Sequence, residues 1–153
     1  MKIKHYFLLT LVLLIIDQST KLLVSECMQL GESIVVSSFF NLTYVHNHGA
    51  AFSFLADEGG WQRYLLSSIS VIVSIFIAVW MTRVDPKHIL KLSALTVLLA
   101  GAIGNLVDRL AYGFVIDFID LHYQDFYYPV FNVADSFIAI GVVMLIFSDR
   151  KSK

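Results

Sequence analysis

The run from Tyr64 to Thr82 contains no charged residue, and it constrains the fold of this chain more than any other feature. As a helix it covers about 28 Å, which is close to the roughly 30 Å hydrocarbon core of a bilayer. Trp61 and Trp80 stand near its two ends, and tryptophan is enriched at both membrane–water interfaces. The sequence therefore predicts a membrane-spanning helix over residues 61–83.

The composition extends this interpretation to the whole chain. Of the 153 residues, 58% are hydrophobic and only 15% are charged, which is typical of an integral membrane protein. We predict a single all-α membrane domain over residues 1–153 with four transmembrane helices. The expected spans are residues 6–24, 61–83, 90–110 and 133–148.

Residues 26–60 differ from these spans because β-branched and aromatic residues are interleaved there with polar ones. The stretch SIVVSSFFNLTYV within this segment is typical of short strands. The segment is too polar to cross a membrane and too long for a turn. We therefore expect a small extracytoplasmic β-sheet between the first and second spans, lying on the membrane surface.

The basic residues indicate how the spans are oriented. Most of them precede the first span, join the second to the third, or follow the fourth; these are Lys2, Lys4, Arg83, Lys87, Lys91, Arg150, Lys151 and Lys153. Cytoplasmic loops carry an excess of Lys and Arg, so we expect this side, with both termini, in the cytoplasm. The net charge of −1 and the lack of a basic face exclude nucleic-acid binding.

The N-terminal segment begins like a signal peptide, with basic residues before an apolar run. Asp17 and Lys21 follow that run and no A-x-A cleavage site appears, so we expect an uncleaved span. A lipidation site at Cys27 is disfavoured, because Glu26 stands where a small residue is needed. As the only cysteine, Cys27 also excludes an internal disulfide.

Three acids of the expected spans fall at one depth. Asp17 lies late in an outward span, Asp108 ends another outward span, and Asp135 begins an inward one. Ionisable residues within a membrane are costly and usually functional. Scattered structural acids would have no reason to share one depth, so we predict a single polar site at the outer face.

Helical spacing groups further polar residues with these acids. Asn105, Asp108 and Arg109 share one face of the third span, and Arg109 is interpreted as compensating Asp108 at the helix end. Asn132 and Asp135 share a face of the fourth span, where they either cap the helix or belong to the site. The i,i+4 spacing of Asp17 and Lys21 predicts an ion pair on one helix face, and this pair is either purely structural or part of the site.

Asp117 and Asp135 are the candidate catalytic pair. Asp117 lies in the apolar run FVIDFI between the third and fourth spans, where burial raises the pKa of a carboxyl group. Asp135 lies at a helix N-terminus, which favours negative charge. Two such carboxyls can share a proton, as in aspartic proteases. The chain lacks the G-x-S-x-G and H-E-x-x-H motifs of other hydrolases.

The segment around Asn47 allows two interpretations. Asn47 precedes small residues that permit close backbone approach, so the segment is either a tight turn or part of the site. His46 and His48 alternate along the chain and could bind a metal ion. A third ligand at fixed spacing is missing, so no metal site is predicted.

Five sequence blocks carry a resemblance to a known family. They are DQSTK (17–21), NHGAAF (47–52), GNLVDR (104–109), VIDF (115–118) and FNVADS (131–136). In these blocks and in their order, the chain resembles the lipoprotein signal peptidase family, also called signal peptidase II.

The resemblance implies an aspartyl endopeptidase of the bacterial inner membrane. Such an enzyme removes the signal peptide from diacylglyceryl-modified prolipoproteins, cutting just before the lipidated cysteine. The resemblance implies that Asp117 and Asp135 are catalytic. Asn47, Asn105, Asp108, Arg109 and Asn132 would position the substrate or support the pair, while Asp17 and Lys21 would hold the shape of the site.

The same resemblance implies the remaining features of the molecule. The sheet would form an extracytoplasmic cradle, with a lid in the neighbouring segment. The partners would be prolipoprotein substrates and membrane lipid, with no metal, organic cofactor or oligomer required.

Two functions of other classes stay open from the residues alone. A small proton-coupled carrier or ion-conducting subunit also uses intramembrane carboxylates, although it needs polar residues at several depths. An assembly subunit could use the acid–base pairs to join helices. Gly101 and Ala102 allow close helix contact without requiring a dimer.

Overall fold

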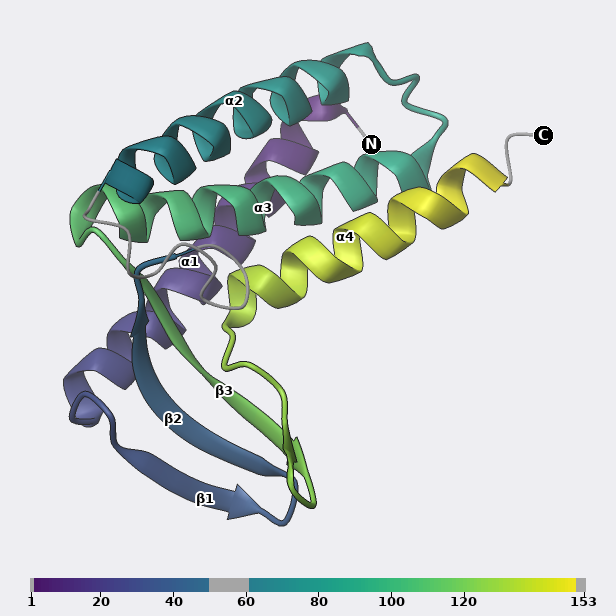
Figure 1. Cartoon of the computed structure of the whole chain (residues 1–153). Coiled ribbons are helices and arrows are strands. Elements are labelled where there is room, and N and C mark those ends of the chain that lie inside the picture. Colours follow the sequence, from purple (N-terminus) through teal and green to yellow (C-terminus); the bar gives the residue numbers. More distant parts are fainter. Residues whose placement is uncertain (1, 50–60, 151–153) are drawn as a thin grey trace.

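Four helices lie beside a small antiparallel sheet in the computed structural model, which describes residues 2–49 and 61–150 (Figure 1). The helices are α1 (Ile3–Cys27), α2 (Trp61–Arg83), α3 (Ile89–Ala111) and α4 (Val133–Arg150). The strands are β1 (Ser33–Ser37), β2 (Phe40–Asn47), β3 (Val115–Tyr123) and β4 (Phe126–Tyr127). The sheet projects from one end of the helical bundle, and both termini lie at the other end (Figure 1).

Three of the described helices are long and apolar enough to cross a membrane. These are α1, the part of α2 from Arg63 to Arg83, and α3. The apolar part of α4, Val133–Ser148, is shorter. The helices fall where the four spans were expected, but only three of them clearly satisfy the requirement of length.

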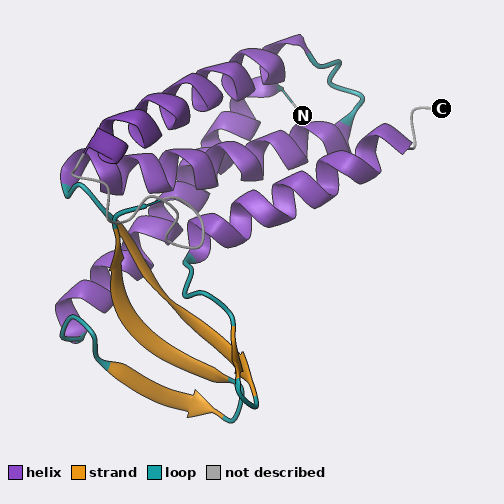
Figure 2. Ribbon diagram, in the orientation of Figure 1, coloured by secondary structure: helices purple, strands orange, loops and turns teal. Residues whose placement is uncertain are grey.

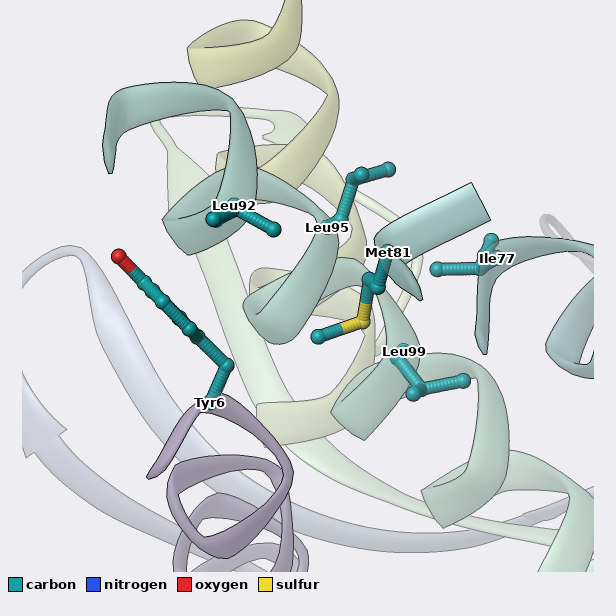
Figure 3. Close-up of a cluster of buried hydrophobic side chains, with 6 residues drawn as sticks. All are labelled: Tyr6, Ile77, Met81, Leu92, Leu95 and Leu99. Carbon is teal, nitrogen blue, oxygen red and sulfur yellow. The ribbon is translucent and has the colours of Figure 1, made fainter. Parts of the chain in front are cut away.

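Helix α3 is the centre of the bundle and packs against α1, α2 and α4. Its apolar side chains meet those of α1 and α2 in a buried cluster, which Figure 3 shows in close-up. The cluster consists of Tyr6, Ile77, Met81, Leu92, Leu95 and Leu99. Because α3 contacts every other helix, its C-terminal end is held at a fixed place in the bundle.

Glycines bring α3 and α4 into close contact. A Cβ at Gly101 would collide with the backbone oxygen of Ala134, and one at Gly141 would lie 2.8 Å from the backbone nitrogen of Leu98. Contacts of this kind with backbone atoms leave no room for a side chain. The close helix contact expected at Gly101 is therefore made within the chain, against the first half of α4.

The sheet is assembled from two separate parts of the chain. Its strand order is β1-β2-β3-β4, so the pair that follows α1 joins the pair that follows α3 (Figure 2). The sequence predicted only the first pair, within residues 26–60, and treated Asp117 as part of a connecting segment. In the structure Asp117 is a strand residue opposite Val45 of β2.

The sheet docks on α1 through one face. Tyr44 of β2 and Ile116 and Phe118 of β3 are buried together with Val24 of α1. Successive side chains of a strand point to opposite faces. Asp117, between Ile116 and Phe118, therefore points to the other side of the sheet.

The glycine contacts predict the effect of adding a single methyl group. Gly101→Ala should destabilise the fold by about 1–3 kcal/mol, because the backbone of α4 must move to admit the methyl group. Thermal unfolding in detergent measures this effect. Val143→Ala on the exposed side of α4 is the control and should stay within about 0.5 kcal/mol of the original protein. Equal stability of Gly101→Ala and the original protein would contradict the close contact.

Candidate active site

A pocket of about 770 Å³ lies between α2, α3, α4 and β3. Its walls are largely apolar and include Ile69 and Val73 of α2, Ala102 of α3 and Ile138 of α4. The polar side chains that line it are Asn47, Ser70, Asn105, Arg109, Asp117, Tyr128, Asp135 and Ser136. An apolar pocket with a few convergent polar groups is the usual form of a binding or active site.

Asp117 reaches this pocket from the middle of the sheet. Its side chain is only 1% exposed, and both carboxyl oxygens accept hydrogen bonds. Nδ2 of Asn47 donates to Oδ2 at 2.9 Å, and Nδ2 of Asn132 donates to Oδ1 at 2.6 Å. The two asparagines fix the direction of the carboxyl group.

Asp135 reaches the pocket from the first turn of α4. Its backbone N–H donates to Oδ1 of Asn132 at 2.9 Å, and its own Oδ2 accepts the backbone N–H of Asn132 at 3.3 Å. This is the reciprocal capping arrangement of a helix N-terminus. Its other oxygen, Oδ1, accepts a hydrogen bond from Nδ2 of Asn105 at 2.7 Å. Asp135 therefore both caps α4 and enters the pocket.

Two asparagine amides link the two carboxyl groups. Nδ2 of Asn132 donates both to Asp117 and to Oδ1 of Asn105, the latter at 3.2 Å. Nδ2 of Asn105 in turn donates to Asp135. Asn132 is completely buried, so its amide cannot exchange these partners for water without rearrangement. The acids of β3 and α4 are thus held in one hydrogen-bonded chain.

Burial raises the pKa of Asp117 to about 7. This value already includes the nearby charge of Asp135, which also raises the pKa, and the hydrogen bonds from Asn47 and Asn132 and the charge of Lys21, which lower it. A carboxyl group with this pKa holds its proton through much of the range in which an ordinary aspartic acid is ionised. Asp117 can therefore donate a proton at neutral pH.

A buried ionic cluster lies beside the pocket. Nζ of Lys21 contacts Oδ2 of Asp17 at 3.0 Å, Oδ2 of Asp108 at 2.9 Å and Oδ1 of Asn105 at 3.0 Å. Asp17 also accepts the backbone N–H of Ala134 at 2.8 Å. The cluster therefore joins α1, α3 and the start of α4, and through Asn105 it reaches Asp135.

Comparison with known proteins identifies the family. The family model for signal peptidase (SPase) II matches residues 9–149. The lipoprotein signal peptidase of Pseudoalteromonas translucida (strain TAC 125) is 49% identical, over 91% of this chain and 84% of that protein. The corresponding protein of Acinetobacter baumannii (strain SDF) is 43% identical, over 90% of this chain and 78% of its own length.

Two solved structures described as bacterial membrane enzymes share the fold. One, determined in meso at 2.3 Å resolution, has a TM-score of 0.86 and 33% identity, covering 98% of this chain and 90% of the other. The second, at 1.9 Å resolution, has a TM-score of 0.84 and 32% identity, covering 99% and 96%.

The chain belongs to the signal peptidase II family. It is therefore a peptidase and a multi-pass bacterial membrane protein, as the resemblance of its five sequence blocks implied. This membership does not favour the proton-coupled carrier or ion-conducting subunit.

The structure brings most of the expected site residues of this peptidase together. The ion pair expected between Asp17 and Lys21 is confirmed, and Lys21 additionally pairs with Asp108. Asp108 also accepts the backbone N–H of Ile116 at 3.1 Å. Asp108 thus orients the start of β3, one residue before Asp117.

Lys21, and not Arg109, forms the ion pair with Asp108, although Arg109 lies in the last turn of α3 and the charge of Asp108 still attracts it. Among the described residues the guanidinium of Arg109 makes no ion pair, and its Nε is buried without a partner. Its Nη1 and Nη2 donate, both at 3.3 Å, to the backbone oxygens of Asn105 and Gly49.

Asn47 combines the two interpretations of its segment. Its Oδ1 accepts the backbone N–H of Gly49 at 3.0 Å, which forms a turn, while its Nδ2 donates to Asp117. Residues 50–52 of the same sequence block, and the expected lid beside them, lie outside the described residues.

The histidine pair has an aromatic environment. His46 stacks on Phe114 with ring centres 3.7 Å apart, and its Nε2 lies 2.8 Å from the hydroxyl of Tyr44. His48 contacts Phe114 edge-on. Within residues 2–49 and 61–150 no three His, Cys, Asp or Glu side chains are grouped to hold a metal ion.

Two residues with a clear part in this architecture were not predicted. Gln18 donates from Nε2 to Oδ1 of Asp108 at 2.9 Å and to Oδ2 of Asp17 at 3.1 Å. Arg63 donates to the backbone oxygens of Arg109 and Leu110, both at 2.9 Å, at the end of α3. Gln18 could have been found from its place beside Asp17 in an otherwise apolar span, whereas the contact of Arg63 depends on the tertiary fold.

The ionic cluster predicts a large effect of removing its cation. Lys21→Met should destabilise the protein by about 3–5 kcal/mol, because two buried carboxylates lose their counter-charge. Lys87→Met, which removes an exposed lysine, is the control in thermal unfolding. Replacing Asp17 and Asp108 by Asn in the Lys21→Met protein should recover part of the loss. The cluster has no such role if Lys21→Met unfolds at the temperature of the control.

Proposed function

We propose that this signal peptidase is an aspartyl endopeptidase in which Asp117 and Asp135 are the catalytic pair. The observation that carries the proposal is the pocket that both carboxyl groups line, where two asparagine amides connect them. The pKa of about 7 at Asp117 adds to this support. One acid of such a pair can keep a proton while the other is ionised.

The proposed cleavage uses one protonated and one ionised carboxyl group. Asp135, as the base, takes a proton from a water molecule while the water oxygen bonds to the scissile carbonyl carbon. Asp117, as the acid, gives its proton to the carbonyl oxygen. As the tetrahedral intermediate collapses and the C–N bond breaks, Asp135 gives the proton it took from water to the leaving nitrogen, and Asp117 takes back a proton from a hydroxyl of the intermediate as the carbonyl re-forms. Asn105 and Asn132 keep the two carboxyl groups oriented throughout.

The proposed substrates are diacylglyceryl-modified prolipoproteins, cleaved just before the lipidated cysteine. The names of the relatives support this substrate class. The apolar walls formed by Ile69, Val73 and Ile138 suit the hydrocarbon part of such a substrate. The carboxyl groups among them supply the polar chemistry of cleavage.

We also propose the orientation of the bundle. The end that carries the termini and the α2–α3 connection faces the cytoplasm, because basic residues are concentrated there. The sheet and the catalytic pocket then face the extracytoplasmic side. This places the scissile bond of a membrane-anchored substrate near the outer surface of the membrane.

Replacing either acid tests the catalytic assignment. Asp117→Asn and Asp135→Asn should each lower the cleavage rate of a lipidated precursor about 10³-fold or more, since both members of the pair take part in proton transfer. Asp120→Asn on the same strand is the control, because Asp120 bonds to Asn41 and Thr43 and does not line the pocket. Thermal unfolding verifies that each variant is folded. Cleavage that survives either change in a folded protein would remove the assignment.

The pKa of Asp117 predicts the alkaline side of the pH profile. The acid must be protonated, so kcat/KM should fall as pH rises through about 7. Asn47 donates to the ionised carboxyl and lowers its pKa, so Asn47→Ala should move this decline upward by about one pH unit. Asn41→Ala, elsewhere on β2, should leave it in place. A decline that moves downward in Asn47→Ala contradicts the acid role of Asp117.

A further inference from the structure

A second pocket lies at the end of the bundle away from the sheet. Its volume is about 250 Å³, and it is formed by the end of α2, the start of α3 and the end of α4. Its lining residues are Trp80, Arg83, Val84, Asp85, His88, Lys91 and Ser148. A water molecule occupies roughly 30 Å³ in the liquid, so this pocket has room for a solvated phosphate group. No step of the proposed cleavage uses it.

The segments of the sequence that flank this pocket are rich in basic residues. Eight of the eleven basic residues precede or begin α1, flank the α2–α3 connection, or end the chain, where only Asp85 and Asp149 are acidic. The remainder of the sequence holds three basic and ten acidic residues. Among the described residues of the α2–α3 connection and its flanks, Arg83, Lys87 and Lys91 outnumber Asp85, so this end of the bundle attracts anions.

Two of the lining side chains, Arg83 and Lys91, are basic. Nζ of Lys91 lies over the ring of Trp80, 5.2 Å from its centre, and Arg83 stands one turn beyond Trp80 at the end of α2. The acid of the lining, Asp85, uses Oδ1 to accept the backbone N–H of Lys87 at 2.8 Å. Its carboxyl group thus shapes the turn, while two cations border the pocket.

The start of α3 adds to the attraction for an anion. The first turn of α3 contains no acidic residue, and His88 at the cap position makes no side-chain hydrogen bond to it. The N-terminus of a helix carries partial positive charge, which an acid in the first turn commonly balances. In the described part of the chain, the basic side chains of this pocket therefore reinforce the helix charge.

The depth of the pocket in the membrane decides the kind of anion. The long apolar helix α2 ends at this pocket and α3 begins there, and Trp80 is of the residue type enriched at the membrane–water interface. The phosphates of the leaflet opposite the catalytic pocket lie at that level. Basic pockets between membrane helices on this side are suited to anionic lipid headgroups.

We propose that the pocket bordered by Arg83 and Lys91 binds the phosphate of an anionic phospholipid. The guanidinium and the ammonium contact the phosphate oxygens, and Trp80 packs beside the glycerol and upper acyl chain. The lipid thereby ties the ends of α2, α3 and α4 together at the side of the bundle that carries no sheet.

Lipid binding to the full chain tests this proposal. The protein is placed in nanodiscs of phosphatidylcholine, and binding of a fluorescent phosphatidylglycerol is measured at fixed ionic strength. Arg83→Gln and Lys91→Gln should each weaken binding about fivefold, and the double variant about thirtyfold. Thermal stabilisation by phosphatidylglycerol should be lost in parallel.

Lys87→Gln is the matched control, because Lys87 lies in the same connection but does not line the pocket. It should bind the lipid like the original protein, and precursor cleavage in neutral detergent shows that every variant is folded. Equal loss in Lys87→Gln and Lys91→Gln would overturn the proposal in favour of unspecific surface attraction. Equal stabilisation by free inorganic phosphate would also overturn it, since the pocket would then bind a soluble anion.

Discussion

The fold is stable only if each charged side chain that is buried among the apolar helices has an oppositely charged or hydrogen-bonding neighbour. Lys21 is nearly inaccessible to solvent and lies between the carboxylates of Asp17 and Asp108. A buried charge without a partner costs several kcal/mol, so the three residues must be brought together for any of them to be buried. They come from α1 and α3, and Asp17 adds a backbone hydrogen bond from α4. One ionic cluster thus fixes the relative positions of the three helices around the pocket.

Two asparagines, Asn105 and Asn132, connect this ionic cluster and the start of α4 to the candidate catalytic pair. Asn132 caps α4 with its oxygen and contacts Asp117 and Asn105 with its amide nitrogen. Asn105 accepts from Lys21 and donates to Asp135. Each asparagine therefore has one end in the scaffold and the other at a carboxyl group. Capping and the proposed part in the catalytic site are compatible for Asn132, because a side-chain amide has both a donor and an acceptor.

The positions of the helices and the grouping of Asp17, Asp108 and Asp135 near one end of the bundle could be predicted, because apolar runs and span order depend only on local composition. The blocks around these acids also led to the family. Strand β3 was missed, since its pairing with β2 joins segments about 70–80 residues apart and leaves no local signal beyond its apolar character. The ion pair of Asp108 with Lys21 was missed for the same reason, because the two residues are adjacent in space and lie far apart in the sequence.

The unpredicted strand is what gives Asp117 its chemical character. In a solvated connecting loop this carboxyl group would be ionised at neutral pH, as aspartic acid ordinarily is. Docking of Ile116 and Phe118 against α1 buries the strand and forces Asp117, on the alternate face, into the apolar pocket near Asp135. Burial and the neighbouring acid then raise its pKa, while the amides of Asn47 and Asn132 limit the rise. The proton that the proposed acid catalysis needs is therefore a consequence of how the sheet packs on the first helix.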